Sequence, residues 1–366
     1  MRLTAVQDVV TRPGPFVTVH AEVGRTTEDA RQQLESRWTT IRHALEAEQV
    51  EPAVVERIGE LLQELPGAGG EARRTIVAAG GEVLFADTQH GAGHFPEAVE
   101  VGPLPDLAPW VAHAGSHVPF ALAVCDHEGA DVSFHTSVHD RGVDADEVGG
   151  RTLHEHQVPS HMAERQYQRH SEQTYRHNAE DVAEALRRGV GEHGCRVVVL
   201  AGGGDARRLV EAGLDGLQVE VVHVEDGGRA QGSSEEALWT GIEAALASLQ
   251  AQEEAEVLEQ LGTGEGQAGT GCRGLDDVLD AFVRGQVDRL LVDLQAAREL
   301  TVDPAAHPGL PLPDDLGEVP ADRVLVALAA ATQADVVTVP AAQTDGEPVS
   351  AVLRWDNRTT PAADTV

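Results

Sequence analysis

The stretch VVVLAGGGD, residues 197–205, is followed at once by ARRLV, residues 206–210. The apolar run predicts a buried strand, the three glycines predict a tight turn, and the second segment predicts the start of a helix. A strand, a glycine-rich turn and a helix are typical of a phosphate-binding loop, but they also occur as a plain structural turn in other α/β folds. The neighbouring residues and segments decide between these two interpretations.

The glycine turn itself argues against a nucleotide site. The dinucleotide fingerprint Gly-x-Gly-x-x-Gly needs its third glycine so that the helix can pack closely on the strand. Gly202 and Gly204 fit the first two positions, but Arg207 occupies the third. The chain also contains no lysine, which a Walker-type phosphate loop requires. We therefore interpret Gly202, Gly203 and Gly204 as a structural turn, and we expect no cofactor.

The composition limits the partners of the chain. Its 366 residues suffice for two or three domains, and its formal net charge is −34. Such a charge repels nucleic acid at long range, so any contact with RNA must come from a local group of arginines. No apolar run reaches the roughly 18 residues of a membrane span, and the N-terminus lacks the pattern of a signal peptide. We expect a cytoplasmic protein that does not bind membranes.

The pattern of strands and helices divides the chain into three blocks. Residues 1–106 predict a strand, two helices and a hairpin that turns at Gly80 and Gly81. The Pro-rich stretch 100–110 predicts a linker. Residues 110–261 predict two strands joined at Glu128-Gly129, a third strand near GRTLHEHQV, a long helix, the quoted strand, turn and helix, and one more strand and helix.

The third block completes an α/β fold of three domains, 1–106, 110–261 and 272–356. Residues 262–271 are rich in glycine and predict a flexible connector. The residues after them predict a helix that ends at Gly285, three strands and a second helix, which together make a small α/β/α domain. In the middle domain, three antiparallel strands precede parallel strands that alternate with helices. This order predicts a ribonuclease H-like mixed sheet.

Histidines are frequent at the start of the predicted long helix. His154 and His156 would share one face of a strand, a spacing that a zinc ion can use. Spacing fixes no carboxylate or thiol beside them, and the three cysteines of the chain lie far apart. We expect a polar, histidine-rich face and no metal site.

The long helix carries a stripe of arginines. At 100° per residue, Arg165, Arg169, Arg176 and Arg187 fall on one face, and apolar residues that can pack on a sheet fall on the opposite face. Residues 151–188 contain six arginines and six acidic residues, so this window is neutral within a chain of charge −34. Two interpretations stay open: a solvated face with i,i+4 ion pairs, or a ridge that meets RNA phosphates.

Three motifs and their order carry a family resemblance. They are GRTLHEHQVPSHMAERQYQRHSEQTYRHNAEDVAEAL, RVVVLAGGGDARRL and LDDVLDAFVRGQVDRLLVD, which begin at residues 150, 196 and 275. Together with the three-block order, they resemble the archaeal and eukaryotic class-one release factor and Pelota superfamily. The resemblance is closer to the bacterial branch found in actinobacteria, which contains the Balon-like ribosome hibernation factors.

The resemblance also indicates which activity is missing. Release factors carry Gly-Gly-Gln before the long helix, whereas the matching stretch of this chain is SHMAERQYQ, residues 160–168, which has no glycine. Gln166 is kept, but side chains replace the glycines that let the backbone approach the ester of peptidyl-tRNA. The family's lysine-containing stop-codon motif cannot be present either. We therefore expect no catalytic residues.

By resemblance, the predicted function is that of a catalytically silent factor, monomeric off the ribosome, which occupies the aminoacyl site of idle or stalled ribosomes during stress. Arg165, Gln166, Arg169 and Arg176 would contact ribosomal RNA. The third block would contact a translational GTPase such as elongation factor Tu. Two other functions stay open: a peptidyl-tRNA hydrolase or rescue factor that uses Gln166 in an unusual loop, and a stress-related protein-binding module.

Overall fold

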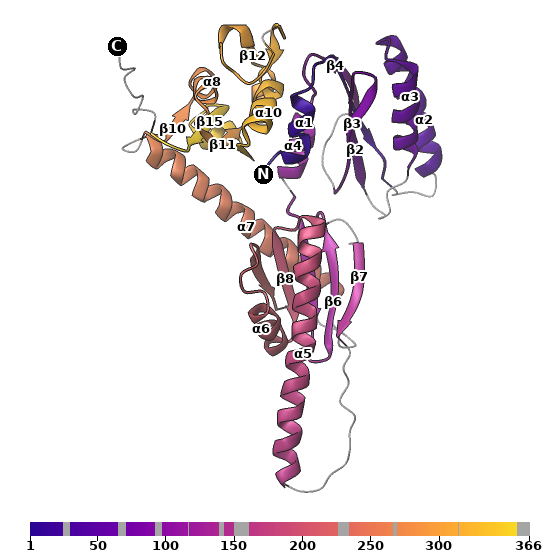
Figure 1. Cartoon of the computed structure of the whole chain (residues 1–366), viewed down its shortest axis with the longest axis vertical. Coiled ribbons are helices and arrows are strands. Elements are labelled where there is room, and N and C mark those ends of the chain that lie inside the picture. The colour runs from indigo at the N-terminus through magenta and orange to yellow at the C-terminus, as the bar shows by residue number, and fades with distance from the viewer. Residues whose placement is uncertain are drawn as a thin grey trace, which may run out of the picture. The chain divides into compact units, whose positions relative to one another are not determined.

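The computed structural model describes residues 1–24, 30–64, 71–91, 97–115, 117–138, 143–149, 161–225, 234–265, 269–313 and 315–356. The chain forms two compact units, whose elements are labelled in Figure 1. The central unit contains the described residues between 117 and 250, and the second, which we call the outer unit, contains the described residues of Met1–Gly67, Glu71–Ser116 and Ala251–Val366. Within the described stretches, every helix is too short or too polar to cross a membrane.

The central unit is built on a five-stranded mixed sheet in the order β7-β6-β5-β8-β9. Its first three strands pair antiparallel, and β8 and β9 add parallel to β5: β5 is Phe120–Cys125, β6 Gly129–His135, β7 Val143–Gly149, β8 Val197–Gly202 and β9 Glu220–Val224. Counted within the unit, the order is 3-2-1-4-5, which is the strand order of ribonuclease H. The predicted mixed sheet is therefore confirmed. Its third strand precedes the stretch GRTLHEHQV, which lies outside the described residues.

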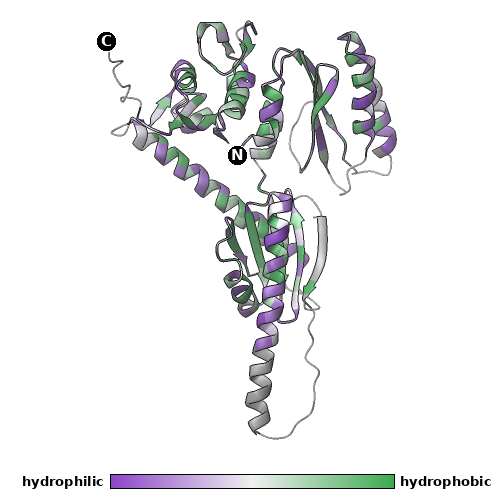
Figure 2. Cartoon of the chain, viewed as in Figure 1, coloured by the Kyte–Doolittle hydropathy of each residue, from purple (hydrophilic) through white to green (hydrophobic). Residues whose placement is uncertain are grey.

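Helices cover both faces of this sheet because its strands alternate their apolar side chains. On β5, Ala121 and Ala123 pack with α5 and α6, whereas Phe120 and Leu122 pack with the first half of α7. Strand β8 is apolar along its length (Figure 2). The helices are α5 (His161–His193), α6 (Gly204–Ala212) and α7 (Glu235–Thr263).

The glycine turn joins β8 to α6 where the chain passes closest to β5. Gly202 has a φ of +90°, and a Cβ atom at this position would lie 2.2 Å from the carbonyl oxygen of Cys125. The N–H of Gly203 donates to the same oxygen at 3.0 Å. Arg207 Nη1 donates to the carbonyl oxygen of Val224 at 3.2 Å, which ties α6 to the end of β9. The close approach of two strands thus accounts for the need for glycine.

The first block of the outer unit has its own four-stranded antiparallel sheet, in the order β3-β2-β1-β4. Two helices pack on one face of it, as the helical spacing predicts. The hairpin turns at Gly80 and Gly81, which both have positive φ. The elements are α1 (Gln7–Val10), β1 (Phe16–Glu22), α2 (Ala30–Ala47), α3 (Pro52–Gln63), β2 (Ala72–Ala79), β3 (Glu82–His90) and β4 (Ala98–Gly102).

The prediction of a linker over residues 100–110 is wrong. Its first residues belong to β4, which pairs with β1, and Ala108–Gly115 form helix α4. Leu107 and Trp110 are buried, and Trp110 Nε1 donates to Asp87 Oδ2 at 2.8 Å. The prolines follow an edge strand, where no further ladder hydrogen bonds are needed, so the sequence of this stretch is typical of a loop although the stretch packs as core.

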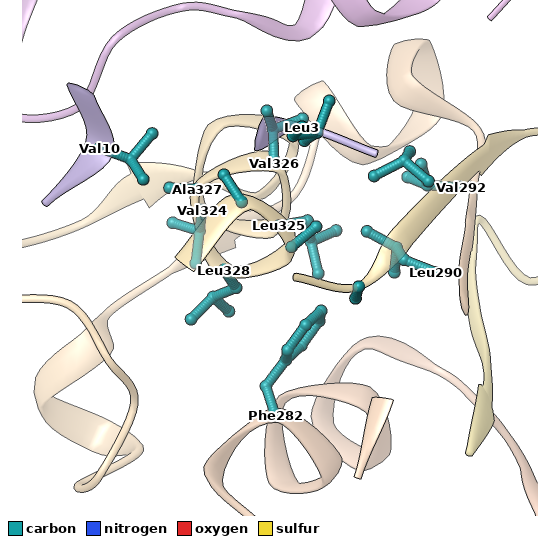
Figure 3. Packing of buried hydrophobic residues seen from close by; sticks show 14 of the residues in the cluster. Leu3, Val10, Phe282, Leu290, Val292, Val324, Leu325, Val326, Ala327 and Leu328 are labelled. Atoms are coloured by element: carbon teal, nitrogen blue, oxygen red, sulfur yellow. The ribbon is translucent and has the colours of Figure 1, made fainter. Parts of the chain in front are cut away.

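The third block forms a second four-stranded sheet, in the order β10-β15-β11-β14, between two helical layers. Leu290 of β11 points into the core that holds α8, α10 and α1, whereas the adjacent Leu291 packs on the second half of α7. Figure 3 shows Leu290, Leu325 and Phe282 converging in the first of these cores. The predicted α/β/α arrangement is therefore present. The elements are β10 (Gly271–Arg273), α8 (Leu275–Val283), β11 (Val287–Val292), α9 (Leu294–Arg298), β12 (Thr301–Val302), β13 (Val319–Pro320), α10 (Ala321–Thr332), β14 (Asp335–Thr338) and β15 (Val349–Leu353).

A buried ionic cluster joins the first and third blocks within the outer unit. Asp106 is 2% exposed, and its Oδ2 accepts from Arg298 Nη2 at 2.9 Å and from Arg323 Nη2 at 3.3 Å. Asp322, fully buried on α10, accepts from the N–H of Arg323 at 2.9 Å. Burial and the nearby carboxylate of Asp106 raise the pKa of Asp322 to about 6, although both arginines oppose this shift.

We predict that Asp322→Asn alters the pH dependence of stability. Because the pKa of Asp322 is higher in the folded chain than its ordinary value of 3.8, its stabilising contribution is complete at low pH and is lost as the pH rises through 6. Asparagine stays neutral at every pH. The free energy of unfolding of the variant, measured relative to that of the wild type, should therefore rise by up to about 2 kcal/mol from pH 4.5 to pH 7.5.

Urea denaturation of both proteins across this pH range measures the difference. Burial lowers the pKa of the nearby His20, whose contribution has the opposite pH dependence but is present in both proteins and cancels. A difference that does not vary with pH would show that Asp322 is ionised throughout.

Candidate functional site

Helix α5 carries the residues predicted to contact RNA. Arg165, Gln166 and Arg169 lie in its first part, residues 161–172, of which the structure describes only the backbone. Arg176 lies in the next part, and its side chain is exposed. The structure therefore places all four residues on one helix and describes the side chain of one of them. The prediction that residues 160–168 precede the long helix is wrong for residues 161–168, which belong to α5; they contain no glycine or proline that would end a helix.

The rotation of α5 about its axis is set by the residues that it buries. Ala179, Val182, Leu186 and Val190 follow the helical spacing and pack into the core under the central sheet. Arg176 precedes this apolar seam on a different face of the helix. The amphipathic pattern thus directs Arg176 to solvent, as the sequence predicts.

Arg187, the last member of the predicted arginine stripe, has a structural role. Its Nε and Nη2 donate to the carbonyl oxygen of Gly213 at 2.9 and 2.6 Å, and Nη2 also donates to that of Asp215 at 2.9 Å. Gly213 follows the last residue of α6, where free carbonyl groups attract a cation. Arg187 therefore holds α5 against the end of α6. The four arginines of the predicted stripe do not all have the same role.

The turn between β5 and β6 is held against α5 by contacts that sequence reasoning missed. The ring of His127 stacks on that of Tyr175, with centroids 4.4 Å apart and an interplanar angle of 28°. Asn178 Nδ2 donates to the carbonyl oxygen of His127 at 3.1 Å. The Asp126 carboxylate accepts from the N–H groups two and three residues ahead, at 2.7 and 3.0 Å. The sequence Asp-His-Glu-Gly indicates the turn, but nothing in it indicates the partner on α5.

The described residues offer no obvious place for a metal ion. They contain no group of three or more histidine, cysteine, aspartate and glutamate side chains with metal-binding geometry. His154 and His156 lie outside the described residues. At the glycine turn, Arg207 Nη2 lies 3.7 Å from the point that a Cβ atom of Gly204 would occupy. A guanidinium group thus lies beside the start of α6, where a phosphate loop would hold its ligand.

Residues 119–267 match the family model of bacterial archaeo-eukaryotic release factor family 2. This segment contains strands β5 to β9, the glycine turn and helices α5 to α7. Over this segment, which is less than half of the chain, the protein is similar to that family. The resemblance to the release factor and Pelota superfamily is thereby confirmed.

The chain also has similar proteins along nearly its whole length. It is 27% identical over 370 residues to the uncharacterized proteins Rv2629 and MT2704 of two Mycobacterium tuberculosis strains, which covers 99% of this chain and 94% of each relative. Similar solved structures include the archaeal translation termination factor aRF1 (16% identity, 96% of each chain, TM-score 0.26). Others are S. cerevisiae Dom34 (11%, 78% of this chain and 79% of that chain, 0.42) and ribosome-bound archaeal Pelota (13%, 97% and 96%, 0.38).

The two described arginines of the stripe should differ in their effect on stability. Arg187→Ala removes the donors to Gly213 and Asp215, and we expect the free energy of unfolding to fall by about 1–3 kcal/mol. Arg176→Ala changes an exposed side chain and should cost no more than about 0.5 kcal/mol. Urea denaturation measures both variants. Equal losses would contradict the structural role of Arg187.

Proposed function

We propose that this protein is a ribosome-binding translation factor that does not release peptides. More narrowly, we propose that it is a Balon-like hibernation factor, which occupies the aminoacyl site of idle ribosomes under stress. The match of residues 119–267 to a release factor family carries the proposal, because it covers the segment that also contains α5. Archaeal Pelota, a member of the same superfamily, is known in a ribosome-bound form, and the proposal assigns this chain the same kind of partner.

The absence of peptide release is proposed from the residues at the start of α5, which begins at His161. The sequence contains no Gly-Gly-Gln, and residues 160–168 contain no glycine. Each side chain at such a tip adds volume and restricts φ where the backbone would have to approach the ester bond. Gln166 alone does not restore this approach. A factor with these residues can occupy the site and keep tRNA out without chemistry.

Contact with RNA is proposed for Arg165, Gln166, Arg169 and Arg176 on α5. The guanidinium group suits phosphate because it presents several N–H donors in a fixed fork. The window around these residues is neutral, whereas the chain as a whole carries −34. The general acidity then opposes non-specific RNA binding, and affinity depends on a few contacts of matched shape.

The proposal also covers the protein partner, the cellular location and the oligomeric state. We propose that the third block contacts a translational GTPase, with elongation factor Tu as the candidate, and that the protein is a cytoplasmic monomer when it is off the ribosome. The alternative function is a hydrolase or rescue factor that uses Gln166 on peptidyl-tRNA. This alternative is favoured only by the retained glutamine.

A release assay separates the silent factor from the hydrolase. Ribosomes that carry labelled peptidyl-tRNA are incubated with the purified full chain, and we expect release no faster than without it. Ribosome occupancy is measured in the same reaction by pelleting. Release that Gln166→Ala abolishes while occupancy stays unchanged would establish the hydrolase and refute the silent factor.

The arginines of α5 are tested by charge reversal. We expect Arg165→Glu with Arg169→Glu to weaken ribosome binding in a pelleting assay at several salt concentrations. Each phosphate contact contributes a log-log salt slope of about −0.9 on duplex DNA and about −0.7 on single strands, so the loss of two contacts should flatten the slope by roughly one to two units.

The matched control reverses two exposed arginines of the outer unit, Arg42→Glu with Arg57→Glu, which changes the net charge by the same amount. It should leave the slope near that of the wild type. Equal salt slopes of ribosome binding for the wild type and the α5 variant, with both proteins folded, would show that the arginine stripe is a solvated face that does not contact RNA. Wild-type protein that never pellets with ribosomes would refute the proposed function.

A further inference from the structure

We propose that His127 and Tyr175 form a platform on which one unpaired RNA base stacks. This inference rests on the proposed function and adds a contact that differs in kind from the arginines. Those would meet phosphates, whereas the stacked pair offers an aromatic surface. Unpaired bases in RNA are commonly bound by stacking on aromatic side chains, including histidine and tyrosine.

The exposure of His127 separates this pair from the other stacked rings of the central unit. Phe120 with His135 and Phe134 with His193 are also stacked, at 4.7 and 4.5 Å, but each of these pairs includes a phenylalanine of the core. His127 is exposed and Tyr175 is half-buried. Tyr175 covers one face of the imidazole, so the accessible part of the ring is its other face and its edge.

The ring is also held in place before any ligand arrives. The Asp126 carboxylate closes the turn that carries His127, and Asn178, 1% exposed, donates to the backbone oxygen of His127 at 3.1 Å. The stack on Tyr175 limits the rotation of the imidazole itself. Because little side-chain entropy remains to be lost on binding, a weak stacking contact becomes effective.

The charges around the platform suit a base better than a phosphate. Asp126 and Glu128 lie on either side of His127 in the sequence. Oε2 of Glu180 lies 3.2 Å from Nδ1 of the exposed His177. Stacking on a base needs little net positive charge, whereas a phosphate would be repelled by these carboxylates. Arg176, adjacent to Tyr175 in sequence and exposed, is the one cation among these residues and could reach the backbone of the same nucleotide.

The test compares His127→Ala with His127→Phe in the full chain. Stacking contributes enough free energy that its loss should weaken ribosome binding about tenfold in the alanine variant. Phenylalanine keeps an aromatic face and should stay within about twofold of the wild type. The control is His43→Ala, an exposed histidine on α2, which should bind as the wild type does. Melting curves confirm that all variants are folded.

A second measurement separates this proposal from the proposed function. Fluorescence anisotropy with labelled hexauridylate and hexaadenylate reports binding of single-stranded RNA in the absence of ribosomes. A loss in His127→Ala that His127→Phe restores supports the platform, even if no variant pellets with ribosomes and the proposed function fails. Equal binding by wild type and His127→Ala in both assays overturns the platform. An equal loss in the alanine and phenylalanine variants also overturns it, because the contact would then not be stacking.

Discussion

The parallel pairing of β8 with β5 holds the central unit together, and it depends on the contact between Gly202 and the carbonyl oxygen of Cys125. At this point the two strands are so close that no side chain fits on β8. The pairing brings the segment that follows α5 into the middle of the sheet, between the antiparallel hairpin and the edge strand β9. The same turn starts α6, whose C-terminal end receives the guanidinium group of Arg187. The turn thus links the sheet to α5 through α6.

Charge has two different uses in this chain. In the outer unit, Arg298 and Arg323 neutralise the buried Asp106 and make the junction of two sequence blocks specific. Buried ion pairs of this kind add little net stability, but they penalise any arrangement that leaves a charge without its partner. Of the α5 arginines whose side chains the structure describes, Arg187 donates to carbonyl oxygens after α6 and Arg176 is exposed. A chain that is strongly acidic overall thus still exposes an arginine on this helix.

Local sequence patterns were sufficient wherever one element packs by its own periodicity. The alternation along β1, the helical spacing in α5 and α8, and the glycines at 80, 81 and 285 predicted elements that the structure contains. Patterns failed for residues 100–110, where prolines indicate a linker although the segment forms β4 and α4. There the deciding partner is β1, a strand distant in sequence, so short-range preference carries no information about it.

The sequence by itself determined the α/β class, the mixed central sheet and the superfamily, because periodicity, glycine positions and motif order are properties of neighbouring residues. Tertiary structure alone decided that His127 stacks on Tyr175 and that Arg187 donates to the carbonyl oxygen that follows α6. It also decided that Asp106 accepts hydrogen bonds from Arg298 and Arg323. These partners are separated by 26 to 217 residues. Contacts over such distances depend on how sheets and helices pack in space, and the residues that make them follow no local period.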